Sequence, residues 1–148
     1  MRWPPALLLL VLGLTGCAGD GTGLDENGNP IGTPPPDDDV TLSGDVQPIF
    51  TANCAFSGCH AGTNPALGQN LSAGQSYGSI VDVVSQEAPA LMRVRPFLPD
   101  SSYLVHKIQG TQGSVGGSGG RMPLGGAPVT ADQIATIRAW ITAGALDN

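Results

Sequence analysis

The stretch Cys54-Ala55-Phe56-Ser57-Gly58-Cys59-His60 (CAFSGCH) decides the fold of this chain, because it places two thiols and an imidazole in one short segment. Groups this close in sequence are available to a single ligand or to each other. Three chemical uses are open to them, and the sequence on either side of the stretch bears on the choice.

The first use is covalent attachment of haem. Each of two thiols can form a thioether with a haem vinyl group, and a His directly after the second Cys is placed to coordinate the iron. The usual signature is C-x-x-C-H, whereas Cys54, Cys59 and His60 have the spacing C-x4-C-H. Because the separation of the vinyl groups is fixed, the two extra residues must bulge, and Gly58 makes a bulge easier.

The other two uses need no haem. In an oxidising compartment Cys54 and Cys59 can form a local disulfide, with His60 merely adjacent. A structural zinc site needs four ligands, and the downstream part of the chain offers only Cys54, Cys59, His60 and His106. We expect His106 to be a helix residue rather than a ligand.

The amino terminus, MRWPPALLLLVLGLTGC (residues 1–17), is predicted to be a targeting segment. Its apolar run, residues 6–14, is shorter than the roughly 20 residues that span a bilayer. The run ends in Leu14-Thr15-Gly16-Cys17, which resembles the lipobox of bacterial lipoproteins. This resemblance implies that residues 1–16 are a signal peptide and that Cys17 is acylated and anchors an exported protein. The alternative is an ordinary secretory peptide in which Cys17 is incidental.

Residues 17–42 read as a disordered tether, since Gly, Pro, Asp and Asn dominate them and offer little to bury. Six of the chain's 12 acidic residues lie there without any Lys or Arg, so the net charge of −6 belongs mostly to the tether. The remainder, residues 43–148, is close to neutral and is predicted to be one domain. It has no basic patch, which argues against nucleic acid as a partner.

Four stretches of this domain read as helices, and none reads as a confident strand, with residues 91–94 the only short candidate. The first begins near Ser43 or Asp45 and runs through Phe50. The second follows the capping-box spacing of residues 72–75, with apolar residues at helical spacing up to residue 84. The third opens at residues 99–100 and stops at Gly110. The fourth has a capping box at residues 130–133, an apolar stripe through Trp140, and Gly144 as its stop.

Three segments, Val46–Gly62 (VQPIFTANCAFSGCHAG), Arg121-Met122-Pro123 and Ile137–Ala145 (IRAWITAGA), together resemble the small c-type cytochrome domains of exported bacterial proteins, including the planctomycete-type group. The resemblance covers nearly all of the domain. It implies an all-α, class I cytochrome c plan around one haem. In this plan the first and last helices pack on each other, here through Phe50 and Trp140, and a Met-Pro loop covers the haem.

The same resemblance implies the roles of the site residues. Cys54 and Cys59 would attach haem c, His60 would be the proximal iron ligand, and Met122 the distal one. Arg121 would pair with a haem propionate or remain a solvated loop residue, and we expect Met92 to be a core residue. A His/Met-ligated iron has no open position for substrate, so the expected function is electron transfer rather than catalysis.

The expected partners are redox proteins, with the membrane reached through the lipid anchor. Ala18 after the lipidated Cys favours the outer membrane or its periplasmic face. The alternative function is that of a haem-free interaction or scaffolding lipoprotein with a Cys54–Cys59 disulfide.

If the lipobox is used, Cys17 is the first residue of the mature protein and carries the lipid. Mass spectrometry of the protein extracted from membranes should find the acyl groups on Cys17 and no peptide from residues 1–16. A free soluble protein that is cleaved elsewhere would contradict this.

Overall fold

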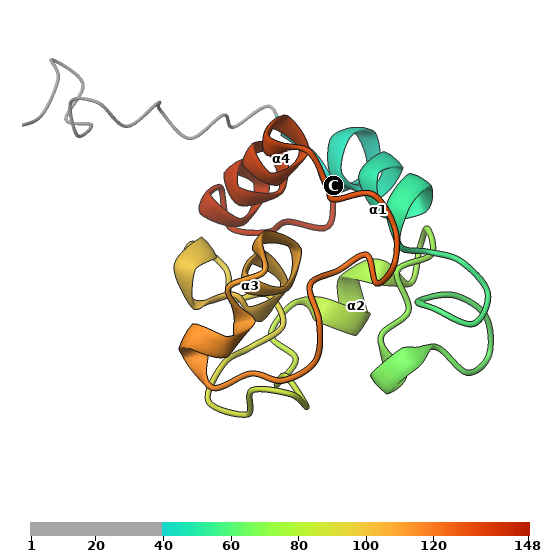
Figure 1. Cartoon of the computed structure of the whole chain (residues 1–148). Helices are drawn as coiled ribbons and strands as arrows, with labels where there is room; N and C mark the ends of the chain where they lie inside the picture. The colour runs from blue at the N-terminus through green and yellow to red at the C-terminus, as the bar shows by residue number, and fades with distance from the viewer. Residues whose placement is uncertain (1–39) are drawn as a thin grey trace, which may run out of the picture. The chain divides into compact units, whose positions relative to one another are not determined.

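The computed structural model describes residues 40–148, which form a small, mostly helical domain. In this part of the chain there are four α-helices and no sheet, so the prediction of a small, mostly helical domain is confirmed (Figure 1). The predicted signal peptide, the predicted lipidation site Cys17 and the predicted tether up to residue 39 lie outside the described residues. Among residues 40–148, no helix is long and apolar enough to cross a membrane.

The first and last elements of the domain lie side by side over one core. A π-helical turn, Leu42–Val46, leads directly into α1 (Gln47–Asn53), and α4 (Ala131–Thr142) packs against the turn. Asn148 holds the same turn, because its side-chain and backbone oxygens accept hydrogen bonds from the Leu42 and Ser43 amides at 2.9 and 2.8 Å. The core side chains come from all four helices and the loops between them: Leu42, Val46, Ile49, Phe50, Leu71, Ile80, Val94, Leu104, Val105, Ile108, Val129, Ile137, Trp140, Ile141 and Ala145.

The final helix forms as its sequence predicts. The Gln133 amide donates to the Thr130 hydroxyl at 3.2 Å, and the Thr130 amide donates to the Gln133 side chain at 3.1 Å, so both halves of the capping box are present. Ile137 and Trp140 are buried, and the Trp140 indole donates to the Leu146 carbonyl at 2.9 Å. Phe50 and Trp140 both belong to the core, and α4 packs on the turn Leu42–Val46 that leads into α1.

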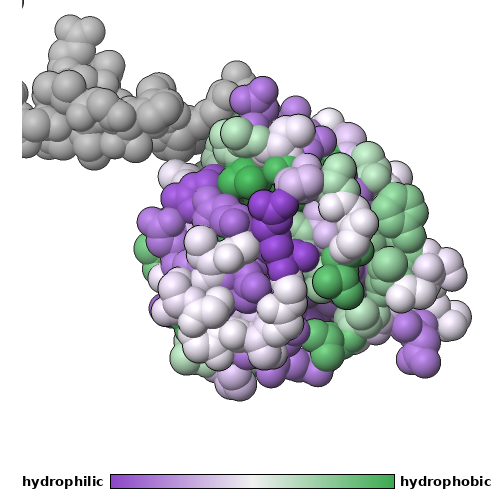
Figure 2. Space-filling model, viewed as in Figure 1, coloured by the Kyte–Doolittle hydropathy of each residue, from purple (hydrophilic) through white to green (hydrophobic). Residues whose placement is uncertain are grey.

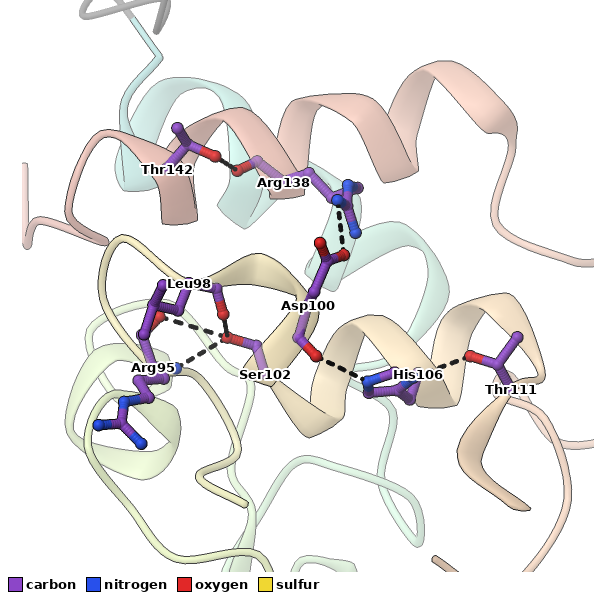
Figure 3. Close-up of polar contacts among 8 residues, drawn as sticks. All are labelled: Arg95, Leu98, Asp100, Ser102, His106, Thr111, Arg138 and Thr142. Carbon is purple, nitrogen blue, oxygen red and sulfur yellow. Dashed lines mark hydrogen bonds and ion pairs between the residues drawn. The ribbon is translucent and has the colours of Figure 1, made fainter. Parts of the chain in front are cut away.

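The third helix is also close to its prediction. A 3₁₀ turn, Pro99–Ser101, precedes α3 (Tyr103–Gln109), and Gly110 ends the helix in the left-handed conformation at φ 80°. Asp100 joins this region to α4 through an ion pair with Arg138 at 2.8 Å (Figure 3). The buried Ser102 hydroxyl accepts from the Arg95 amide at 2.8 Å and contacts the Leu98 carbonyl at 3.0 Å, which fixes the entry to α3 (Figure 3).

The start of the first helix differs from its prediction. Thr41, and not Ser43 or Asp45, is the capping residue, because the Thr41 hydroxyl accepts from the Gly44 amide at 3.0 Å. Asp45 instead reaches back and accepts from the Thr41 amide and hydroxyl at 2.8 and 2.9 Å. These two hydrogen bonds lower the pKa of the Asp45 carboxyl.

The predicted second helix is wrong in extent. The helix α2 spans only Ser76–Ile80, and Ser72 does not cap it. Val81 is extended, and two isolated bridges follow, Val81 with Val94 and Val84 with Met92, so contacts with a distant segment replace the helix. Residues 91–94 are accordingly extended at these bridges without forming a strand. Met92 is half-buried rather than a core residue.

The Gly-rich connection from α3 to α4 is folded across the domain. It contains a 3₁₀ turn, Gln112–Val115, and returns to α3 where the Met122 amide donates to the Lys107 carbonyl at 3.0 Å. Figure 1 shows this segment crossing between α3 and the side that carries α1 and α2. On the face in Figure 2, more of the hydrophobic surface lies on the side of α1 and its following loop than on the side of α3.

The capping box makes α4 a measurable contributor to stability. Thr130→Ala removes an acceptor for the Gln133 amide and should lower the free energy of unfolding by about 1 kcal/mol. Thr130→Ser keeps the hydroxyl and should lose much less. Chemical denaturation followed by Trp fluorescence would measure both, and equal losses for the two variants would show that the capping hydroxyl contributes nothing.

Candidate functional site

The loop between the two thiols, residues 54–60, is closed by hydrogen bonds to the carbonyl of its first residue. Cys54 ends α1, and its carbonyl accepts from the Phe56 and His60 amides at 2.9 and 3.3 Å. The Cys59 amide donates to the Phe56 carbonyl at 3.0 Å, which closes a β-turn with Gly58 at its third position and φ 82°. A type II turn needs this left-handed conformation at its third position, and Gly58 supplies it without strain.

The two thiols are free and differ in their exposure. Cys54 is half-buried against the core at the end of α1, whereas Cys59 is exposed. Burial raises the pKa of the Cys54 thiol to about 11, and the neighbouring Cys59 contributes to this increase. At neutral pH Cys54 is therefore a protonated thiol, and its nucleophilic thiolate form is scarce.

The side chain of His60 is held in one tautomer. Its Nδ1 lies 3.1 Å from the Gln69 carbonyl, which only accepts, so Nδ1 carries the proton and Nε2 carries the lone pair. Burial lowers the pKa of His60, the hydrogen bond to Gln69 opposes this, and nearby Arg93 lowers the pKa further. A neutral imidazole fixed at Nδ1 by a backbone carbonyl is the usual arrangement of a metal-ligating His.

The thiols, His60 and Met122 line the same cleft. This cleft has a volume of about 450 Å³ and is bounded by α1, the loop 54–60 and the segment 122–127. Its volume lies within the roughly 300–1,000 Å³ of small-molecule sites. The structure thus brings together all four residues that the sequence assigned to this site: Cys54, Cys59, His60 and Met122.

A smaller inner cavity of about 90 Å³ adjoins the cleft, because Cys54, His60 and Met122 line both spaces. The inner cavity is also lined by Arg93 and by Lys107 of α3. The site therefore has an outer part with the two thiols and an inner part with buried charges.

His106 lies apart from this site. Both of its ring nitrogens are engaged, Nδ1 with the Thr111 hydroxyl at 2.9 Å and Nε2 with the Asp100 carbonyl at 3.0 Å (Figure 3). Within residues 40–148, no three His, Cys, Asp or Glu side chains gather as a metal site. The zinc alternative therefore lacks its fourth ligand in the described part of the chain.

Two residues of the site carry no signal in the sequence. Gln69 acts through its backbone carbonyl, which any residue type supplies, and Arg93 reaches the inner cavity from the loop between α2 and α3. Arg121, which the sequence offered as a propionate partner, is exposed and lines neither space. A lone Arg between Met92 and Val94 gives no hint of its burial.

The exposure of the thiols predicts unequal reactivity in the reduced, cofactor-free protein. At pH 8, iodoacetamide should alkylate the exposed Cys59 faster than Cys54, because a thiol with a pKa of about 11 has little thiolate at that pH. Peptide mass spectrometry over a time course would measure both rates. Urea should abolish the difference, and equal rates in the folded protein would contradict the observed burial.

Comparison of the chain with profiles of known protein families, with curated proteins and with solved structures found no match. What the site does therefore follows from its own residues and their geometry.

Proposed function

We propose that this chain is an exported, membrane-anchored electron carrier with one covalently attached c-type haem. Cys54 and Cys59 are the attachment points, His60 is the proximal iron ligand and Met122 the distal one. The observation that carries the proposal is the cleft of about 450 Å³ that these four side chains line together. When bound, the haem supplies one-electron chemistry between the ferric and ferrous states of its iron.

The residues present fit this group. Thioether bonds need two accessible thiols, and neither Cys54 nor Cys59 is in a disulfide. An axial His must offer an unprotonated nitrogen, and the Gln69 carbonyl leaves the lone pair on Nε2 of His60. A distal thioether must reach the same space, and Met122 lines both the cleft and the inner cavity.

The chain's own residues also support electron transfer over catalysis. His60 and Met122 together would fill both axial positions, which leaves no iron site for a substrate. Thioether ligation raises the reduction potential relative to two imidazoles. The apolar side chains around the cleft, among them Phe56 and Leu124, are 49% and 75% exposed, so one edge of the site lies close to solvent, where a redox partner can approach.

Covalent attachment is tested by co-expression with the cytochrome c maturation machinery. The protein should keep its haem stain on a denaturing gel, and the double variant Cys54→Ala/Cys59→Ala should lose the stain. Cys17→Ser is the control, because it changes the third cysteine of the chain and leaves Cys54 and Cys59 in place, so the stain should remain even without the lipid anchor. If the unmodified protein is colourless, the haem-free interaction lipoprotein becomes the better hypothesis.

The assignment of Met122 is tested in the haem-loaded protein. Met122→Ala should abolish the Met–iron charge-transfer band of the ferric spectrum, lower the midpoint potential and allow carbon monoxide to bind. Met92→Leu and His106→Ala should do none of these, because Met92 lies outside the site and His106 is bonded elsewhere. If His106→Ala opens the iron while Met122→Ala changes nothing, the ligands are two imidazoles.

A further inference from the structure

The inner cavity contains two buried cations and one anion. Arg93 and Lys107 are only 6% and 7% exposed, and both line the cavity together with Glu87 and Tyr103. All three charges act on His60. Burial lowers the pKa of His60, Arg93 and Lys107 lower it further, and Glu87 raises it. The cavity therefore has an excess of one positive charge among its lining residues.

Lys107 already has a counter-ion. Its ammonium group lies 2.9 Å from the Glu87 carboxylate and donates to the Ser118 carbonyl at 3.1 Å. The Tyr103 hydroxyl contacts the same Glu87 oxygen at 3.3 Å. Since Glu87 is engaged by these two groups, the unmatched charge is that of Arg93.

Arg93 has no carboxylate partner among residues 40–148. Its Nη1 donates to the Ser79 carbonyl at 2.8 Å, with a longer contact of 3.5 Å to Gly68, and its Nη2 donates to the Leu67 carbonyl at 2.6 Å. A guanidinium has five N–H donors. These contacts leave Nε–H and one Nη2–H without a partner in the described part of the chain.

The Nε and Nη2 atoms share one edge of the guanidinium plane, and such an edge binds a carboxylate through two parallel hydrogen bonds. A buried charge is costly unless it is paired and hydrogen-bonded. A carboxylate on the molecule that fills the cavity would supply what Arg93 lacks, whereas the thiol end of the site offers no cation.

We propose that the free edge of Arg93 binds a carboxylate of the ligand in this cavity, and that the carboxylate is a propionate of the porphyrin. The identity of the ligand rests on the proposed function, whereas the anion preference of Arg93 rests on its own contacts. The site thus has a direction, with the thioether-forming edge of the ligand at Cys54 and Cys59 and an acidic edge toward Arg93.

The test compares haemin with haemin dimethyl ester, in which both carboxylates are blocked. The full chain is produced without the maturation machinery, kept reduced, and titrated with each porphyrin by absorbance. The unmodified chain should bind haemin at least about tenfold more tightly than the ester, or about 1.4 kcal/mol. Arg93→Gln should bind the two alike, and the exposed Arg95 provides the matched control, since Arg95→Gln should keep the preference.

Each other outcome is informative. Equal binding of haemin and ester by the unmodified chain overturns the carboxylate site, and so does a preference that survives Arg93→Gln in a variant whose circular dichroism is unchanged. Arg93→Lys, which keeps the charge but not the two-donor edge, should retain only part of the preference. If neither haemin nor its ester binds and the co-expressed protein is also unstained, the proposed function is wrong, and the propionate site at Arg93 is wrong with it.

The haem-loaded protein gives a second readout if the cofactor-free chain binds neither porphyrin but the co-expressed protein stains. Removal of a buried cation beside the site stabilises the ferric state, so Arg93→Gln should have a lower midpoint potential than Arg95→Gln. Equal potentials would overturn the role of Arg93 while leaving covalent attachment intact.

Discussion

The packing of α4 against the turn Leu42–Val46 is the contact on which the rest of the domain depends, because it joins the first and last elements over a single core. That core fixes α1, and the end of α1 fixes Cys54. The same core includes Ile108 of α3. The backbone carbonyl of the preceding residue, Lys107, accepts a hydrogen bond from the Met122 amide. The same apolar core therefore positions both walls of the cleft, the end of α1 on one side and Met122 on the other.

A second set of contacts, made by backbone carbonyls, links Arg93 to His60. Arg93 holds the carbonyls of Leu67 and Ser79, and the carbonyl two residues beyond Leu67, that of Gln69, orients His60. Leu67 adopts a left-handed conformation at φ 54°, which is unusual for a residue with a side chain, and its carbonyl accepts from both Arg93 and Gln86. The buried cation of Arg93 thus connects the loop between α2 and α3 to the loop that positions the imidazole of His60.

Sequence reasoning reached the local features of this domain and missed those that depend on distant contacts. The Thr130 capping box and the Gly110 stop are encoded within a few residues, so both could be predicted. The second helix stops early because Val81 bridges Val94, a contact no local pattern shows. At the site, Cys54, Cys59 and His60 are adjacent in sequence and were found, whereas Arg93 is identified only by its burial and its missing counter-ion.

The closure of the domain by its last helix also sets an order in time. Cys54 becomes half-buried only when it packs on a core that includes Ile137 and Trp140, more than 80 residues later in the chain. Before this core forms both thiols are open to solvent, and afterwards Cys54 is half-buried at the cleft while Cys59 stays exposed. A large modifying enzyme would therefore reach Cys54 more easily before α4 packs on the core than after.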